Sequence, residues 1–127
     1  MMAFTWADYL TVANTLNAAG DEASLRAAVS RAYYAVFGEA KEAAETEKGE
    51  DFPTGSIHEA VVNYYDGSSD NARKVFAANL KRLKTSRVRA DYHRNRLVDA
   101  RYANQAISEA TQLLKDLTAI AGSGASP

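Results

Sequence analysis

A long apolar stripe with the period of an α-helix constrains the fold of this chain more than any other feature. Between positions 25 and 40, apolar side chains recur every three or four residues, which is the spacing of one helix face. The stripe consists of Leu25, Ala28, Val29, Ala32, Tyr33, Val36, Phe37 and Ala40. So wide an apolar face must be buried, and it predicts a core helix that continues through Ala44 and ends before Lys48 and Gly49.

Few residues interrupt the rest of the chain. Proline occurs only at Pro53 and Pro127, and the charged, glycine-containing segment 47–55 is the one clear internal loop. There is no internal repeat, no β-hairpin signal and no linker. A length of 127 residues fits one domain, which we place at 1–121, followed by a disordered tail at 122–127.

Four further amphipathic segments accompany the central helix. Residues 5–18 carry one apolar stripe, and Ser56 opens a capping-box pattern for a short third helix. A fourth helix follows from about Asp70, and Asp99 is the candidate N-cap of a last helix. The expected buried face of the fourth helix is Ala72, Val75, Phe76, Asn79, Leu80 and Leu83. The expected buried residues of the last helix are Ala103, Ala106, Ile107, Ala110, Leu113, Leu114 and Leu117. These patterns predict an all-α fold, an up-and-down helical bundle of four main helices plus a short helix.

Composition excludes several kinds of site. Cysteine is absent, which excludes disulfides and thiol nucleophiles, and two histidines 35 residues apart make a metal site improbable. No Gly-rich loop or paired carboxylates point to a cofactor, so none is expected. The start of the chain lacks a signal-peptide pattern and no apolar run approaches the length of a membrane span, so we expect a cytoplasmic protein without a membrane partner.

Positive charge gathers in one window. Eight of the fifteen Lys and Arg residues lie between Lys81 and Arg101, with only two acids, so eight minus two leaves about six positive charges in a protein of net charge −1. The helical period also breaks there. A solvated helix face is the plain interpretation, but such a concentration favours contact with RNA or phosphate. The candidate substrate-binding residues in the window are Arg89, Arg94 and Arg96.

Arg87 and His93 are the candidate catalytic residues. RNA cleavage without a metal needs an acid and a base, and imidazole titrates near neutral pH and serves in either role. A guanidinium stabilises the negative charge that develops on the phosphoryl oxygens. The two residues supply both functions if a turn brings them together, and in a dimer a second histidine comes from the partner subunit. The alternative is that His93 is an exposed loop histidine.

Two residues of the central helix lie away from its apolar stripe. Arg31 and Tyr34 either form a dimer face or a ledge that faces the basic window and contributes to substrate binding, and Arg31 alternatively pairs with Asp91. His58 follows a helix N-cap, for which a capping or packing role is the expectation.

Three short motifs carry a resemblance to a known family. Ser30-Arg-Ala-Tyr-Tyr-Ala-Val-Phe37, Ser56-Ile-His58 and Arg87-Val-Arg-Ala-Asp-Tyr92 resemble, in order and spacing, motifs of HEPN domains in the small prokaryotic branch that has an R-x-x-A-D-Y motif. The resemblance covers roughly residues 5–120. It implies a helical bundle that commonly forms a homodimer. In many relatives it also implies a metal-independent endoribonuclease, often the toxin beside a small nucleotidyltransferase antitoxin; other relatives bind RNA or nucleotide without cleavage.

The resemblance also bears on single residues. The family's catalytic pattern is an arginine, four to six residues and a histidine, which Arg87 and His93 satisfy, although Val88 stands where the family usually has a polar residue. In such pairs a tyrosine near this motif can be adenylylated, and Tyr92 is the candidate here, unless its ring packs under the loop. The expected function is a toxin-like, RNA-directed protein; the alternative is a non-catalytic interaction module that dimerises and docks a nucleotidyltransferase.

Overall fold

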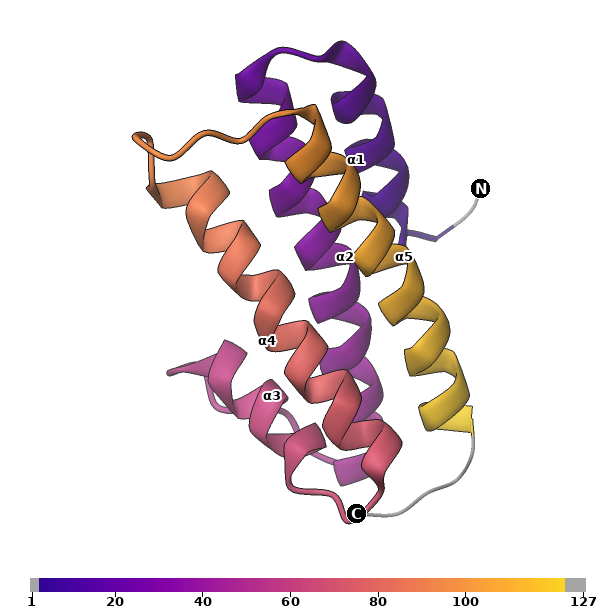
Figure 1. Cartoon of the computed structure of the whole chain (residues 1–127). Coiled ribbons are helices and arrows are strands. Elements are labelled where there is room, and N and C mark those ends of the chain that lie inside the picture. Colours follow the sequence, from indigo (N-terminus) through magenta and orange to yellow (C-terminus); the bar gives the residue numbers. More distant parts are fainter. Residues whose placement is uncertain (1–2, 123–127) are drawn as a thin grey trace.

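Helices form all the regular structure within residues 3–122, the part of the chain that the computed structural model describes. They are α1 (Asp8–Ala19), α2 (Glu22–Lys48), α3 (Ile57–Asp66), α4 (Asn71–Tyr92) and α5 (Ala100–Gly122). The four longer helices lie along one another, and the short α3 lies beside the lower half of α4 (Figure 1). This arrangement confirms the expected all-α bundle of four main helices plus a short helix.

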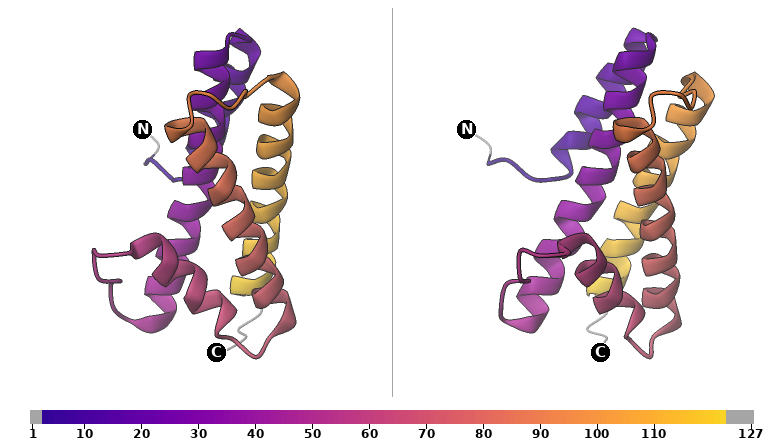
Figure 2. Two further views of the ribbon diagram at one scale, coloured as in Figure 1. Left: turned by 60° about the vertical axis from the view of Figure 1, so that its left-hand side comes forward. Right: turned by 90° about the vertical axis from the view of Figure 1, so that its left-hand side faces the viewer.

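The central helix is α2, which packs against each of the other four helices. Its predicted stripe is buried in full, and residues beside the stripe are buried as well, including Ser30, Ala35 and Gly38. Burial on so many sides is possible because many of these side chains are alanine and let neighbouring helices approach closely. The two further views show α4 and α5 beside α2 along most of its length (Figure 2).

Local signals fix most helix ends. Gly20, with a φ of 82°, ends α1 in the left-handed region that glycine enters without strain. Asp21 caps α2 by accepting a hydrogen bond from the Ser24 amide at 3.1 Å. The predicted cap at Asp99 is confirmed, because its carboxylate accepts from the Tyr102 amide at 2.9 Å. Asp70 caps α4 in the same way, accepting from the Ala72 amide at 3.1 Å.

The predicted capping box at the start of α3 is wrong. Ser56 is the residue before the helix, but its backbone is left-handed, with a φ of 53° and a ψ of 39°, and its side chain makes no capping bond. Serine at an N-cap normally has an extended backbone, which is what aims its hydroxyl at the first-turn amides. The first helix also differs from its predicted range of 5–18. It begins at Asp8, because Thr5 and Trp6 form a separate turn in front of it.

The fourth helix continues through the basic window, where we had predicted that the helical period breaks. Its buried face runs on from Leu83 to Arg87 and Ala90, and the helix ends only at Tyr92. The prediction failed because it assigned arginine to the surface. It also misplaced part of the face: Ala72 is exposed and Val75 is 49% exposed, whereas Ala77 is buried.

Arg73 is a second buried arginine on α4 that the sequence pattern did not indicate. It is fully buried, and its guanidinium pairs with Glu47 from the last turn of α2. Glu47 also accepts a hydrogen bond from the Tyr64 hydroxyl at 2.8 Å. The carboxylate therefore joins the start of α4, the end of α2 and α3, which fixes the lower end of the bundle.

The last helix bears on two predictions, the position of the tail and the residues of this helix that are buried. The last helix includes Gly122, the first residue of the predicted tail, and the other residues of that tail, 123–127, lie outside the described part of the chain. Of the residues predicted to be buried on α5, Leu114 is only half-buried and the others are buried. Within residues 3–122, no helix combines the length and the apolar character that a membrane span needs.

The core assignment predicts a difference between two matched leucine substitutions. Leu113 is 2% exposed on α5, whereas Leu97 is 60% exposed. We expect Leu113→Ala to lower the free energy of unfolding by about 2–5 kcal/mol, because it leaves a cavity in the core. We expect Leu97→Ala to change it by less than about 0.5 kcal/mol. Urea denaturation measures both, and equal losses would contradict this packing.

Candidate basic loop and Arg87 site

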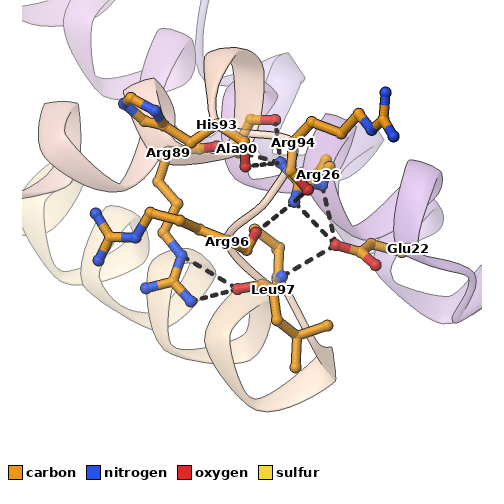
Figure 3. Close-up of polar contacts among 9 residues, drawn as sticks. Glu22, Arg26, Arg89, Ala90, His93, Arg94, Arg96 and Leu97 are labelled. Atoms are coloured by element: carbon orange, nitrogen blue, oxygen red, sulfur yellow. Dashed lines mark hydrogen bonds and ion pairs between the residues drawn. The ribbon is translucent and has the colours of Figure 1, made fainter.

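Arg26, on the second turn of α2, organises the segment that follows α4. Its guanidinium donates hydrogen bonds to a group of backbone carbonyls at the end of α4 and in the following loop (Figure 3). The acceptors are the carbonyl oxygens of Arg89 at 3.2 Å, Ala90 at 3.0 Å, His93 at 3.2 Å, Arg94 at 3.4 Å and Arg96. The Arg89 and His93 carbonyls also accept from the backbone amides of His93 and Arg96, both at 3.1 Å. Because all five carbonyls lie at the C-terminal end of a helix and in its loop, one cation bonds to them together.

Glu22 completes this arrangement from the first turn of α2. Its Oε2 accepts from Arg26 Nε at 3.1 Å and Nη2 at 2.9 Å, and also from the Val98 amide at 3.2 Å. These bonds hold the Arg26 guanidinium in the orientation in which its N–H groups point toward the backbone carbonyls. They also hold the far end of the loop, so the segment 93–97, which we call the basic loop, is anchored at both ends.

The side chains of the basic loop point outward as a consequence. The carbonyls of His93, Arg94 and Arg96 are drawn toward Arg26, and the three side chains are exposed (Figure 3). None of the three takes part in a side-chain ion pair within residues 3–122. The loop therefore presents its two guanidinium groups to solvent from a fixed backbone.

Arg89 has a different environment from the one that the sequence suggested. Its guanidinium donates to the Leu97 carbonyl and lies 4.3 Å from the centre of the Tyr102 ring. It thus holds the basic loop against α5. Its side chain is only partly exposed beside that loop, and its hydrogen-bonding groups are partly used by the protein itself.

Arg87 points into the bundle, where it meets α2. It is 8% exposed, its Nη1 donates to the Tyr34 hydroxyl at 2.9 Å, and the same nitrogen lies 3.5 Å from a carboxylate oxygen of Asp91. The Ser30 hydroxyl donates to that carboxylate at 3.2 Å. Arg87 Nε is buried without a partner. A guanidinium placed in this way keeps its charge and retains an unused donor.

The structure does not bring Arg87 and His93 together within one chain. The continuous helix separates them: at 3.6 residues per turn, six positions turn the side-chain direction by about 120°. The ring of His93 is exposed at the C-cap of α4, and no hydrogen bond or ring contact joins it to Arg87. Joint action of the two residues was expected only if a turn brought them together, and the helix that continues to Tyr92 leaves no such turn between them.

His58 is the histidine that lies near Arg87. Its ring stacks on Phe37 with a centroid distance of 4.3 Å, and its Nδ1 is 2.7 Å from the Tyr33 hydroxyl. Burial, with Arg87 and Lys84 nearby, lowers the pKa of His58 below its ordinary value of 6.5, so the ring is neutral at pH 7. Burial also raises the pKa of the Tyr33 hydroxyl.

The tautomer of His58 follows from these contacts. The Tyr33 hydroxyl keeps its proton and has no other acceptor among the described residues, so it donates to Nδ1. A neutral ring that accepts at Nδ1 carries its own proton on Nε2. His58 was predicted to cap or pack, and packing is its observed role. Its proximity to Arg87 was not foreseen, although Ser56-Ile-His58 and the Arg87 motif were both singled out.

Tyr92 and Arg31 do not make the purely structural contacts that the sequence offered as alternatives. Tyr92 is 70% exposed, so its ring does not pack under the loop. Arg31 does not pair with Asp91; its guanidinium lies over the rings of Tyr9 at 4.8 Å and Tyr34 at 5.2 Å. Tyr34 does form the ledge that was one of its two expectations, because it lies between Arg31 and Arg87.

Comparison with known proteins adds no assignment. No family model, curated protein or solved structure matches the chain. Within residues 3–122, no three His, Asp or Glu side chains gather closely enough to hold a metal ion. The side chains at this site offer guanidinium, imidazole, phenol and carboxylate groups.

The Arg26 contacts predict that this side chain contributes much more to stability than an exposed arginine does. We expect Arg26→Met, which keeps the aliphatic stem, to lower the free energy of unfolding by about 1.5–3 kcal/mol, because the charged donor to several carbonyls is lost. Arg82→Met, at an exposed position of α4, is the matched control. Denaturation measures both, and hydrogen exchange should show faster exchange of the Val98 amide in Arg26→Met alone. Equal stability of the two variants would contradict the role given to Arg26.

Proposed function

We propose that this protein is an RNA-directed protein of the HEPN type whose basic loop binds the phosphate backbone. The observation that carries the proposal is the anchoring of the loop by Arg26 and Glu22, which presents Arg94 and Arg96 outward. Cations on a fixed backbone lose less entropy on binding than cations on a flexible tail. Backbone phosphates are the ligand that such a row of guanidinium groups fits best.

The catalytic part of the proposal is metal-independent RNA cleavage. Arg87 stabilises negative charge on the phosphoryl group, and His93 acts as the acid or base that transfers a proton during cleavage. Since the two side chains diverge within one chain, the proposal needs a homodimer in which His93 of one protomer serves Arg87 of its partner. Exposure of His93 and Tyr92 leaves both free to reach a second copy.

A second candidate function has its own supporting observation. Tyr92, directly before the basic loop, and Leu97, its last residue, are 70% and 60% exposed. Large apolar side chains next to a charged loop fit contact with another protein. The candidate is a non-catalytic module that docks a nucleotidyltransferase, for which the accessible hydroxyl of Tyr92 is the proposed site of adenylylation. In that case the added phosphate lies beside the exposed guanidinium groups and blocks RNA.

RNA binding is expected to depend on the basic loop and on salt. Reversal of Arg94 and Arg96 to glutamate removes two phosphate contacts, so the slope of log K against log salt should shrink by about 1.4 for single-stranded RNA. Reversal of the exposed Arg82 and Lys115 changes the net charge equally and should leave most of the affinity. Filter binding at several salt concentrations measures both. If the loop reversal does not change the affinity for RNA, then RNA binds at another surface or the protein does not bind RNA.

Cleavage is expected to persist in EDTA and to require His93. His93→Ala should lower the cleavage rate by about 10²–10⁴-fold, the usual contribution of a general acid or base, with unchanged stability because the side chain is exposed. Arg87→Lys retains the positive charge but removes the planar set of N–H donors, so it tests whether cleavage needs that planar set. His58→Gln is the control for the second histidine. Loss of cleavage in His58→Gln and not in His93→Ala would move the proton transfer to His58. Absence of cleavage with intact RNA binding would favour the docking module.

A further inference from the structure

The aromatic pocket between the N-terminal segment and α2 lies outside the basic loop. It has a volume of about 350 Å³ and is lined mainly by apolar surface. We call it the Trp6 pocket. Its walls are Trp6, Tyr9, Arg31, Tyr34, Phe37 and Gly38. Pockets of this size with aromatic walls and few polar groups are typical of small planar ligands.

The position of Trp6 is fixed by contacts with α2. The indole Nε1 donates to Glu42 Oε1 at 2.9 Å, and the next amide, that of Ala7, donates to Glu39 Oε2 at 2.9 Å. The ring lies so close to Gly38 that a Cβ added there would be 2.2 Å from Trp6 Cγ. The pocket therefore depends on glycine at this position, and both nearby carboxylates already have partners.

Arg31 is the charged group of the pocket that has no hydrogen bond or ion pair within residues 3–122. Its guanidinium lies between the rings of Tyr9 and Tyr34. The other cation at the pocket, Lys41, pairs with Glu45 at 3.1 Å. Aromatic rings hold the Arg31 side chain in place while its donors remain unused. Such a guanidinium is ready for a bidentate anion.

We infer that the Trp6 pocket binds one nucleotide unit, with the base against the aromatic walls and the phosphate on Arg31. Stacking on aromatic side chains accepts any base, and a guanidinium accepts two phosphate oxygens. The choice of a nucleotide over other aromatic anions rests on the proposed function. Tyr34 connects this pocket with the Arg87 site, because its ring lines the pocket and its hydroxyl accepts from Arg87. A bound base would therefore fix the position of the strand relative to Arg87.

The chain contains one tryptophan, so its fluorescence reports on this pocket alone. We expect adenosine 5′-monophosphate and uridine 5′-monophosphate to quench Trp6 fluorescence with saturation. Ribose 5-phosphate lacks the stacking base, and adenosine lacks the phosphate, so both should bind at least about tenfold more weakly. A short single-stranded RNA should quench more strongly than either monophosphate if the natural source is a strand, and no more strongly if it is a free nucleotide.

Two variants test the assigned contacts. Arg31→Gln, which keeps a planar amide, should raise the Kd for the monophosphates about tenfold or more, and Arg31→Lys should recover part of the affinity. Arg82→Gln removes an exposed arginine elsewhere on the surface and should leave the Kd unchanged. Gly38→Ala should abolish quenching by displacing Trp6, with circular dichroism to verify that the helices remain. Saturable quenching that is equal in wild type and Arg31→Gln, or no saturable quenching by any of these ligands, would overturn the inference.

The failure of this inference and the failure of the proposed function are distinguishable. RNA binding that depends on Arg94 and Arg96 but leaves Trp6 fluorescence unchanged would reject the pocket and retain the basic loop. Quenching by monophosphates without any RNA binding would retain a nucleotide pocket and reject RNA as the target of the loop.

Discussion

Burial of α2 on several sides is the constraint on which the rest of the structure depends. Each of the other helices packs against α2, and each of the three sites described above includes residues of α2. The basic loop is held by Arg26 and Glu22, Arg87 meets Tyr34, and Trp6 rests on Gly38. The helix that supplies the core thus also supplies the partners of the polar groups that surround it.

The two groups of cations differ in what their surroundings allow. Arg87 is almost fully buried and has Tyr34 and Asp91 as partners. These contacts fix the orientation of its guanidinium, and the Asp91 carboxylate partly neutralises its charge. Arg94 and Arg96 are exposed, and only their backbone is held. An exposed guanidinium contributes to encounter and affinity for a polyanion, whereas a buried one suits a specific contact with one phosphoryl group. The division matches a surface that attracts a strand and an interior group that acts on it.

Sequence periodicity predicted the fold well because it reports burial of apolar residues. The stripe on α2 and most of the buried face of α5 follow from it, and the cap at Asp99 follows from the preference for aspartate at helix starts. It failed where polar residues are buried. Arg73 and Arg87 lie on the inner face of α4, and a pattern that treats arginine as exposed ends the helix too early.

The candidate site was predicted only in part, for a related reason. The charge in the basic window was visible, but the anchoring carbonyls belong to the backbone and have no sequence signal, and Arg26 was not singled out. His58 and Arg87 are 29 positions apart on different helices, and only the packing of α3 and α4 on α2 brings them near one another. Single motifs named the residues, while their proximity depended on tertiary structure.

The hydrogen bonds of Arg26 join positions 63 to 70 residues apart. Contacts over such a separation form only after the entropy of closing the intervening chain has been lost, which requires α2 and α4 to dock first. We therefore expect the basic loop to become ordered only after α2 and α4 have docked. A nascent or partly unfolded chain carries the same arginines without their fixed arrangement, so the ordered cationic surface is a property of the completed fold alone.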